Sequence, residues 1–320
     1  MHNHWKIKVI LLFSVLFLAI ALGLSRGAVH LSLAELILRE NRHIFALRLC
    51  RILTAIMVGS GLSVTGIALQ AILRNPLAEP YLLGTSSGAA LAAVTAVLLG
   101  ISAIYLPLAA FIGAIFTVIL VYHLARQGGR IAAQSLILSG VIISVAFSAV
   151  IVFLISISGN EALHGTMWWL WGSVQVYDLK LLSAAGLIVA LGTAVIFILA
   201  QDLNAISLGE EEAIHLGVNI ETIKKILFFT TSLVTAGLVS VCGIIGFVGL
   251  IIPHIARMLF GPNHRLLIPC ACILGAAFMV FCDMFSRTLF APLEIPIGVI
   301  TALAGAPIFI ILLKGRQQVE

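Results

Sequence analysis

Charged side chains gather at three places in this 320-residue sequence. Three consecutive acids, Glu210–Glu212, lie in a polar segment of the second half of the chain. Asp283 lies in an apolar stretch four residues before Arg287, which is the favourable order for an ion pair along a helix. The third place is a group of arginines near the N-terminus: Arg26, Arg39, Arg42, Arg48 and Arg51. Each group could bind an oppositely charged neighbour, on this chain or on a partner.

The remaining reactive side chains form no catalytic or metal-binding set. Serines and histidines are isolated, the five cysteines form no C-x-x-C pair, and His254 has no second ligand at i+3 or i+4. We interpret the cysteines as small core residues and Asp283 as the partner of Arg287 rather than a proton relay. The sequence also lacks a G-x-x-x-x-G-K-[ST] phosphate loop. We therefore expect no enzyme activity, cofactor or metal in this chain.

The composition places the chain in lipid. Apolar residues make up 61% and charged residues only 10%, whereas soluble domains average about 45–50% and about 25%. Too few polar groups remain to coat a water-soluble globule. A soluble enzyme, a nucleic-acid-binding protein and a disordered scaffold are all disfavoured.

The hydropathy pattern predicts an all-α, polytopic membrane protein that forms a single domain over residues 1–320. A membrane span needs about 20 apolar residues, and ten stretches come close to this, the eighth being short. These stretches are Val9–Leu24, Ile52–Leu73, Tyr81–Leu99, Ile104–Leu124, Ile131–Ile157, Leu181–Ala200, Ile226–Ile245, Phe247–Leu259, Leu266–Met284 and Ile295–Leu313.

The basic residues predict the orientation. With ten spans, 11 of the 18 lysines and arginines fall on one face, which the positive-inside rule makes cytoplasmic. These are Lys6, Lys8, Arg74, Arg126, Arg130, Lys224, Lys225, Arg257, Arg265, Lys314 and Arg316. An even number of spans also puts both termini on that face. The five N-terminal arginines then lie outside, against the rule, either as tolerated surface charge or as a site for an acidic partner.

A polar segment of about residues 203–224 lies on the predicted cytoplasmic face. The stretch Glu210–Leu216 is predicted to form a short helix. Its acidic residues are favourable at the helix N-terminus, which is the positive end of the helix dipole, and Gly217 is suited to cap the C-terminus. Asn219 is suited to cap the helix that follows. The segment is either a docking element for another protein or a solvated loop, and we favour the first.

Three longer motifs are less generic: Arg74–Ala90, Gly246–Arg257 and Leu293–Phe309. Small residues at Gly84 and Gly88 permit close helix approach, and Pro253 falls inside a span that is too short to cross alone. A broken or short helix at membrane depth is tolerated only against protein or a watery cavity, which indicates a pathway. Together the motifs resemble the permeases of type II ABC importers, which carry iron-siderophore chelates, haem and cobalamin. The resemblance runs from about Arg48 to Arg316.

The resemblance implies roles for particular residues. In that family each subunit has ten helices, and two copies surround one central pathway. The family's paired coupling helices, which rest on the ATPase, correspond here to Leu208, Gly209, Glu210, Glu211, Glu212, Ala213, Leu216 and Gly217. The outer arginines that receive acids of the binding protein correspond to Arg48, Arg51 and Arg287. Pathway or gate positions would be Ala132, Ala133, Gln134, Ser139 and Trp168.

The resemblance thus predicts the membrane permease of an ATP-driven importer in the cytoplasmic (inner) membrane. Its cargo would be a metal chelate delivered by a binding protein, with iron-siderophore first and haem or cobalamin as alternatives. Its partners would be a second copy, two ATP-binding cassette subunits that bind ATP and Mg²⁺, the substrate-binding protein and membrane lipid, with no nucleic acid. An ion- or proton-coupled secondary transporter is the main alternative, and an intramembrane enzyme a third.

Overall fold

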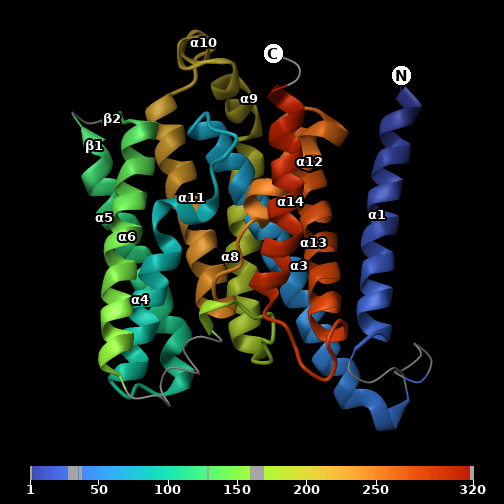
Figure 1. Cartoon of the computed structure of the whole chain (residues 1–320). Helices are drawn as coiled ribbons and strands as arrows, with labels where there is room; N and C mark the ends of the chain where they lie inside the picture. Colours follow the sequence, from blue (N-terminus) through green and yellow to red (C-terminus); the bar gives the residue numbers. More distant parts are fainter. Residues whose placement is uncertain (1, 28–34, 36–37, 128–129, 159–168, 318–320) are drawn as a thin grey trace.

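A computed structural model describes residues 2–27, 35, 38–127, 130–158 and 169–317 of the chain, which form a bundle of helices (Figure 1). The long helices are α1 (His2–Ser25), α3 (Arg42–Ile72), α5 (Leu106–Ala125), α6 (Ala133–Ile157), α8 (Leu179–Ile198), α11 (Ile220–Cys242), α13 (His264–Thr288) and α14 (Ile297–Gln317). The shorter ones are α4 (Thr85–Leu98), α9 (Ala200–Leu208), α10 (Glu210–His215) and α12 (Val248–Phe260). Single 3-10 turns form η1 (Arg39–Asn41), η2 (Pro80–Leu83) and η3 (Ala103–Tyr105).

The predicted all-α membrane architecture is confirmed. Seven of the described helices are long and apolar enough to cross a membrane, and three more apolar helices are shorter. Each of the ten predicted stretches overlaps one of these helices. The strand pairing in the described part is a two-residue antiparallel pair, β1 (Arg126–Gln127) with β2 (Arg130–Ile131), and one isolated bridge between Phe290 and Leu293.

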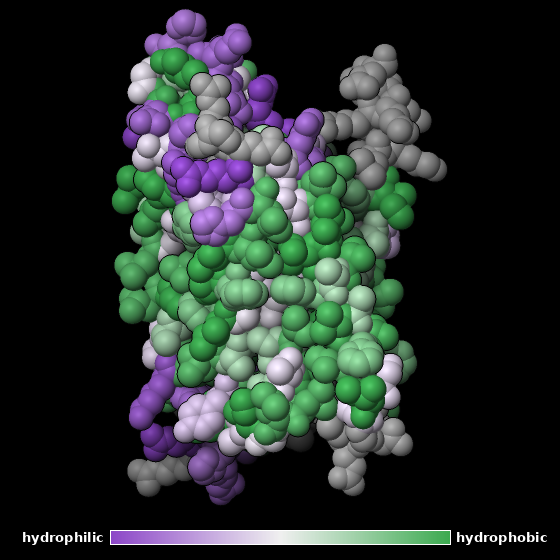
Figure 2. Space-filling model, turned by 90° about the vertical axis from the view of Figure 1, so that its left-hand side faces the viewer, coloured by the Kyte–Doolittle hydropathy of each residue, from purple (hydrophilic) through white to green (hydrophobic). Residues whose placement is uncertain are grey.

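Apolar and polar side chains separate along the bundle. Figure 2 shows a hydrophobic band around the middle of one face, with hydrophilic residues above and below it. Many large apolar side chains point outward in this band, as expected where lipid is the solvent. The band explains how a chain with so few charges avoids aggregation in its natural surroundings.

Helix α3 forms the centre of the bundle, and small residues let its neighbours approach. Of its most apolar part, 83% is buried, against 6% for α6, which lies at the periphery. A Cβ added to Gly59 of α3 would lie 2.1 Å from the carbonyl oxygen of Gly275 on α13. A Cβ at Gly88 of α4 would lie 2.6 Å from the carbonyl oxygen of Gly113 on α5, so the predicted close approach is confirmed there.

The bundle has two distinct ends. Helix α1 begins and α14 ends at the same end as α9, α10 and the β1–β2 pair, which we call the α10 end (Figure 1). At the opposite end, α1 ends and α3 begins, and we call this the arginine end. The common location of the two termini follows from the even number of spans.

Candidate functional site

The segment α9–α10 at the α10 end is built by local capping. Gly209, just before α10, has a φ of 158°, a backbone conformation that residues with a side chain rarely adopt, so glycine is favoured there. At the other end, Gly217 has a φ of 82°, and its N–H donates to the carbonyl of Ile214 while that of Val218 donates to Ala213. This double hydrogen bond is a Schellman motif, so the predicted glycine cap is confirmed.

The next helix begins as predicted. The side chain of Asn219 accepts a hydrogen bond from the N–H of Thr222 at 3.2 Å and caps α11. A small apolar core of Ala205, Ile206, Ala213 and Ile220 joins α9, α10 and α11. The short helix is therefore held in a fixed place and does not hang from a flexible loop.

The outer surface of this segment combines apolar and acidic side chains. Leu208, Ile214 and Leu216, at the end of α9, within α10 and just after α10, are 69%, 62% and 65% exposed. Glu211 is exposed beside them, while Glu210 pairs with Lys224 at 2.7 Å. Exposed apolar side chains rimmed by charge are typical of a protein-docking surface.

At the arginine end, the predicted docking arginines form a buried ionic network. Arg51 donates to Asp283 Oδ1 through Nε at 3.1 Å and Nη2 at 2.9 Å. Its Nη1 donates to both carboxylate oxygens of Glu294, at 2.9 and 3.0 Å. Arg287 Nη2 lies 2.9 Å from Asp283 Oδ2, so the predicted i,i+4 pair is confirmed. The side chain of Asp283 is fully buried, so this acid requires both guanidinium partners.

Two of these arginines also hold the end of α1. Arg287 donates to the carbonyls of Gly23 at 3.1 Å and Arg26 at 3.2 Å, and Arg48 donates to that of Leu24. Arg48 and Arg287 are both buried. The docking role of Arg48, Arg51 and Arg287 remains a prediction, because their described contacts lie within this chain.

Glu294 is a member of the network that sequence reasoning missed. It lies in the connection between α13 and α14, far from Arg51 in sequence, and its side chain is 32% exposed whereas that of Arg51 is 8% exposed. Gln175 donates a further hydrogen bond to it. Any acidic partner that reached Arg51 would have to share it with Glu294 or displace Glu294.

The predicted pathway residues lie around the start of α6. Ala132 is the extended residue before this helix, and Gln134 in its first turn is exposed. Ala133 and Ser139 are half-buried. Trp168 lies outside the described residues. Just before Ala132, the strands β1 and β2 pair in antiparallel register, with Arg126 opposite Ile131 and Gln127 opposite Arg130.

A second site missed by the sequence is the non-helical segment between α11 and α12. The carboxylate of Glu79 accepts a hydrogen bond from the N–H of Phe247 at 2.6 Å, and the hydroxyl of Tyr81 accepts one from Ile245. Phe247 has a φ of 70°, a conformation that is unfavourable for a bulky residue. Burial raises the pKa of Glu79, and the hydrogen bond from Phe247 opposes this shift only in part.

This segment borders a cavity of about 440 Å³, lined by Trp171, Ile244, Phe247, Val299 and Leu303 among others. Irregular backbone at membrane depth occurs where it lines a cavity. Within the described part of the chain, no three His, Cys, Asp or Glu residues come together as metal ligands. The geometry of this segment and its cavity therefore suits passage of a molecule through the bundle.

Comparison with protein families settles what kind of protein this is. A model of the FecCD transport family matches residues 11–315. The chain belongs to this family. It is a transport permease subunit of an ABC importer, and ATP hydrolysis is done by separate ATPase subunits. Such a permease works with that ATPase and with a binding protein.

Individual relatives and a solved structure agree with this family. The chain is 41% identical over 272 residues to the cobalamin import system permease protein BtuC of Halobacterium salinarum, covering 85% of this chain and 73% of the relative. It is 38% identical to the hemin transport system permease protein HmuU of Yersinia pestis, covering 95% of each. A structure described as an inward-facing conformation of a "metal-chelate type ABC transporter" superposes with a TM-score of 0.85 at 36% identity, covering 95% of this chain and 97% of that one.

Proposed function

We propose that this chain forms the translocation pathway for a bulky metal chelate. The similarity to permeases named for cobalamin and hemin supports this proposal most directly, over 85% and 95% of the chain. These two chelates are therefore the first to test, and iron-siderophore, which the motifs also resemble, is the third. The cavity beside Phe247 and Leu303 has mainly apolar walls, which suits a large cargo held weakly.

The ATPase subunits would dock on the α9–α10 segment, at a cytoplasmic α10 end. Eleven of the 18 basic residues group with this end by sequence, as the positive-inside rule requires of a cytoplasmic face. Leu208, Ile214 and Leu216 would enter an apolar cleft on the ATPase, with Glu211 and Glu212 at its rim. ATP and Mg²⁺ would be bound by that subunit and not by this chain.

The binding protein would dock at the arginine end. Arg26 and Arg42 are exposed there and can steer an acidic partner, because exposed charges act mainly on the association rate. Arg48, Arg51 and Arg287 lie behind them in the buried network. Docking on Arg51 would require Glu294, the half-exposed member, to move or share its partner.

A second copy of the chain would complete the pathway. Helix α6 is apolar but scarcely buried within one chain, and Val299 and Leu303 of α14 are exposed beside the cavity that includes Phe247. Two copies that meet through α6 and α14 would enclose this surface and create the central route.

Reconstitution tests the proposal. The permease, its ATPase and its binding protein would be placed in liposomes, and uptake of cyanocobalamin, haem and a ferric siderophore measured with ATP. Uptake of one chelate that requires ATP hydrolysis is the expected result. Uptake that persists with a hydrolysis-dead ATPase and follows a proton or sodium gradient would contradict it and favour a secondary transporter.

A further inference from the structure

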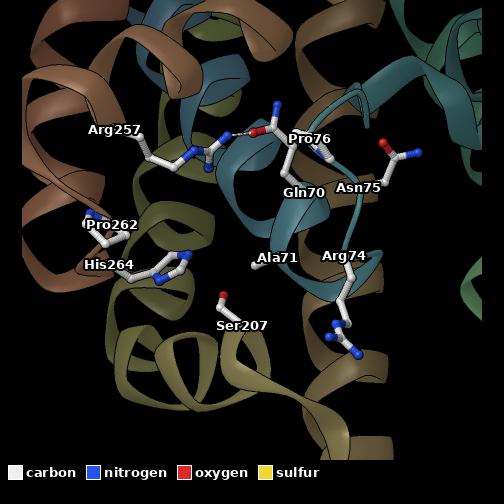
Figure 3. A pocket seen from close by; sticks show the side chains of 9 residues that line it. All are labelled: Gln70, Ala71, Arg74, Asn75, Pro76, Ser207, Arg257, Pro262 and His264. Carbon is white, nitrogen blue, oxygen red and sulfur yellow. Dashed lines mark hydrogen bonds between the residues drawn. The ribbon is translucent and has the colours of Figure 1, made fainter. Parts of the chain in front are cut away.

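A polar cavity at the α10 end is not explained by transport. It has a volume of about 340 Å³ and lies between the end of α3, α9, α12 and the start of α13 (Figure 3). Its polar lining comes from Gln70, Arg74, Asn75, Ser207, Arg257 and His264. None of the described residues that line it is acidic, whereas two of them are arginines. The cavity therefore favours an anion over a cation.

Arg257 is held in place within this cavity. Its guanidinium donates to Oε1 of Gln70, and Nε2 of Gln70 donates in turn to the carbonyls of Ala78 at 3.2 Å and Gly249 at 3.3 Å. These bonds orient the amide, so that the guanidinium is fixed before any ligand arrives. Arg74 also lines the cavity, but it is exposed, and its guanidinium points away from Arg257 and His264 (Figure 3).

His264 contributes a different group. Its side chain is only 4% exposed, and its Nδ1 lies 2.8 Å from Oδ1 of Asn204. The same oxygen accepts the backbone N–H of His264, and the amide nitrogen of Asn204 donates to Asn263. Oδ1 is thus an acceptor, and Nδ1 must carry the proton. Nε2 therefore carries a lone pair, is buried, and has no hydrogen-bond partner among the described residues.

The ligand must therefore supply both negative charge and a hydrogen-bond donor. Sulfate or a phosphodiester can accept from Arg257 but carries no proton for Nε2 at neutral pH. A phosphate monoester or inorganic phosphate still carries one P–OH group at a pH near its second pKa, which is about 6. We propose that this cavity binds a phosphoryl group that retains a P–OH, with Arg257 as donor to its oxygens and His264 Nε2 as acceptor. The group would come from free phosphate or from a phosphatidic acid headgroup.

Binding of radiolabelled inorganic phosphate to the purified permease–ATPase complex at pH 6 tests this proposal. We expect saturable binding that sulfate displaces at least about tenfold less well than unlabelled phosphate, because sulfate leaves Nε2 unpaired. Arg257→Gln should weaken binding about tenfold or more. Arg265→Gln is the matched control, since it removes the same charge from an exposed residue that does not line the cavity, and it should leave binding unchanged.

Three results would overturn the proposal: no saturable binding, equal competition by sulfate, or equal losses in the two arginine variants. Competition by nanodiscs of phosphatidic acid, but not of phosphatidylcholine, would support the headgroup as source, and its absence would support free phosphate. None of these results depends on ATP-driven uptake.

Discussion

The arginine end and the α9–α10 segment both concentrate charge, but they use it in opposite ways. At the arginine end, Arg51 and Arg287 share the fully buried Asp283, so these charges are paired inside the chain. In α9–α10, the acids and the apolar residues Ile214 and Leu216 face outward from a small apolar core. The first region joins helices of this chain, whereas the second presents a surface to a partner. A cluster of charged residues in the sequence does not by itself show whether the charges pair within the chain or face a partner.

The largest expected effect is on the buried network. Asp283→Ala removes the buried carboxylate that Arg51 and Arg287 share and leaves Arg51 with Glu294 alone, and we expect a loss of about 3–5 kcal/mol in the free energy of unfolding. Asp178→Ala, which removes only the exposed cap of α8, should cost about 1 kcal/mol. Unfolding of the two purified variants in detergent measures both. Equal losses would show that the network stabilises the fold no more than an exposed helix cap does.

Substitutions on the outer surface of α9–α10 should have the opposite effect: they should weaken association with a partner and leave the stability of the fold unchanged. Ile214→Asp should weaken association with the ATPase by about 2 kcal/mol or more, because an apolar anchor becomes charged, and should leave the fold stable. Leu77→Asp, at an exposed position of the same end outside α9–α10, should leave association unchanged. The prediction is checked by measuring the affinity of each variant for the ATPase and the thermal stability of the same variant. A loss of stability in Ile214→Asp without a loss of affinity would assign α10 to the fold.

A substitution at Glu294 should affect both the stability of the fold and the association with a partner. Glu294→Gln removes one carboxylate from Arg51 and should lower stability by only about 1 kcal/mol, because Glu294 is partly exposed and Asp283 remains. The uncompensated charge should speed association of the binding protein several-fold at low salt. Slower association would show that Glu294 itself contacts the binding protein. By contrast, replacing Arg51 with Glu is a poor test of docking, since a third acid would be buried beside Asp283 and Glu294.

The smallest expected effect concerns Glu79. Its pKa is raised by burial, so the folded chain binds its proton more tightly than the unfolded chain does. The stabilising contribution of protonated Glu79 is therefore fully present at low pH. It is lost as the pH rises from the usual pKa of a glutamate side chain to the raised pKa of Glu79. Glu79→Gln should flatten this dependence while it keeps an acceptor for Phe247. Thermal unfolding of both proteins across that range measures the difference, and an unchanged slope would contradict the assignment.

Much of the fold could be predicted from the sequence because lipid makes apolar length directly informative. The ten stretches, the short helix with Pro253 and the capping by Gly217 and Asn219 depend only on local composition and backbone chemistry. The common end of the termini followed from the number of spans. The importer family came from longer motifs and not from composition.

The parts that the sequence did not reveal depend on residues far apart in the chain. Glu294 reaches Arg51 across 243 positions, and Glu79 reaches Phe247 across 168. Neither pairing has a periodicity that hydropathy could detect. The burial of Arg48 was also unforeseen, because an arginine before an apolar stretch normally snorkels toward water. Each of these contacts depends on the close approach of helices that only the tertiary packing provides.

The ratio of chelate uptake to ATP hydrolysis in proteoliposomes tests the central claim most directly. Glycine at residues 211–214 would disrupt α10 while leaving the core residues of α9 and α11 in place. We predict that hydrolysis continues while uptake falls to background, because the motion of the ATPase no longer reaches the pathway. Uptake per ATP equal to that of the unaltered protein would contradict the assignment of α10 as the coupling element.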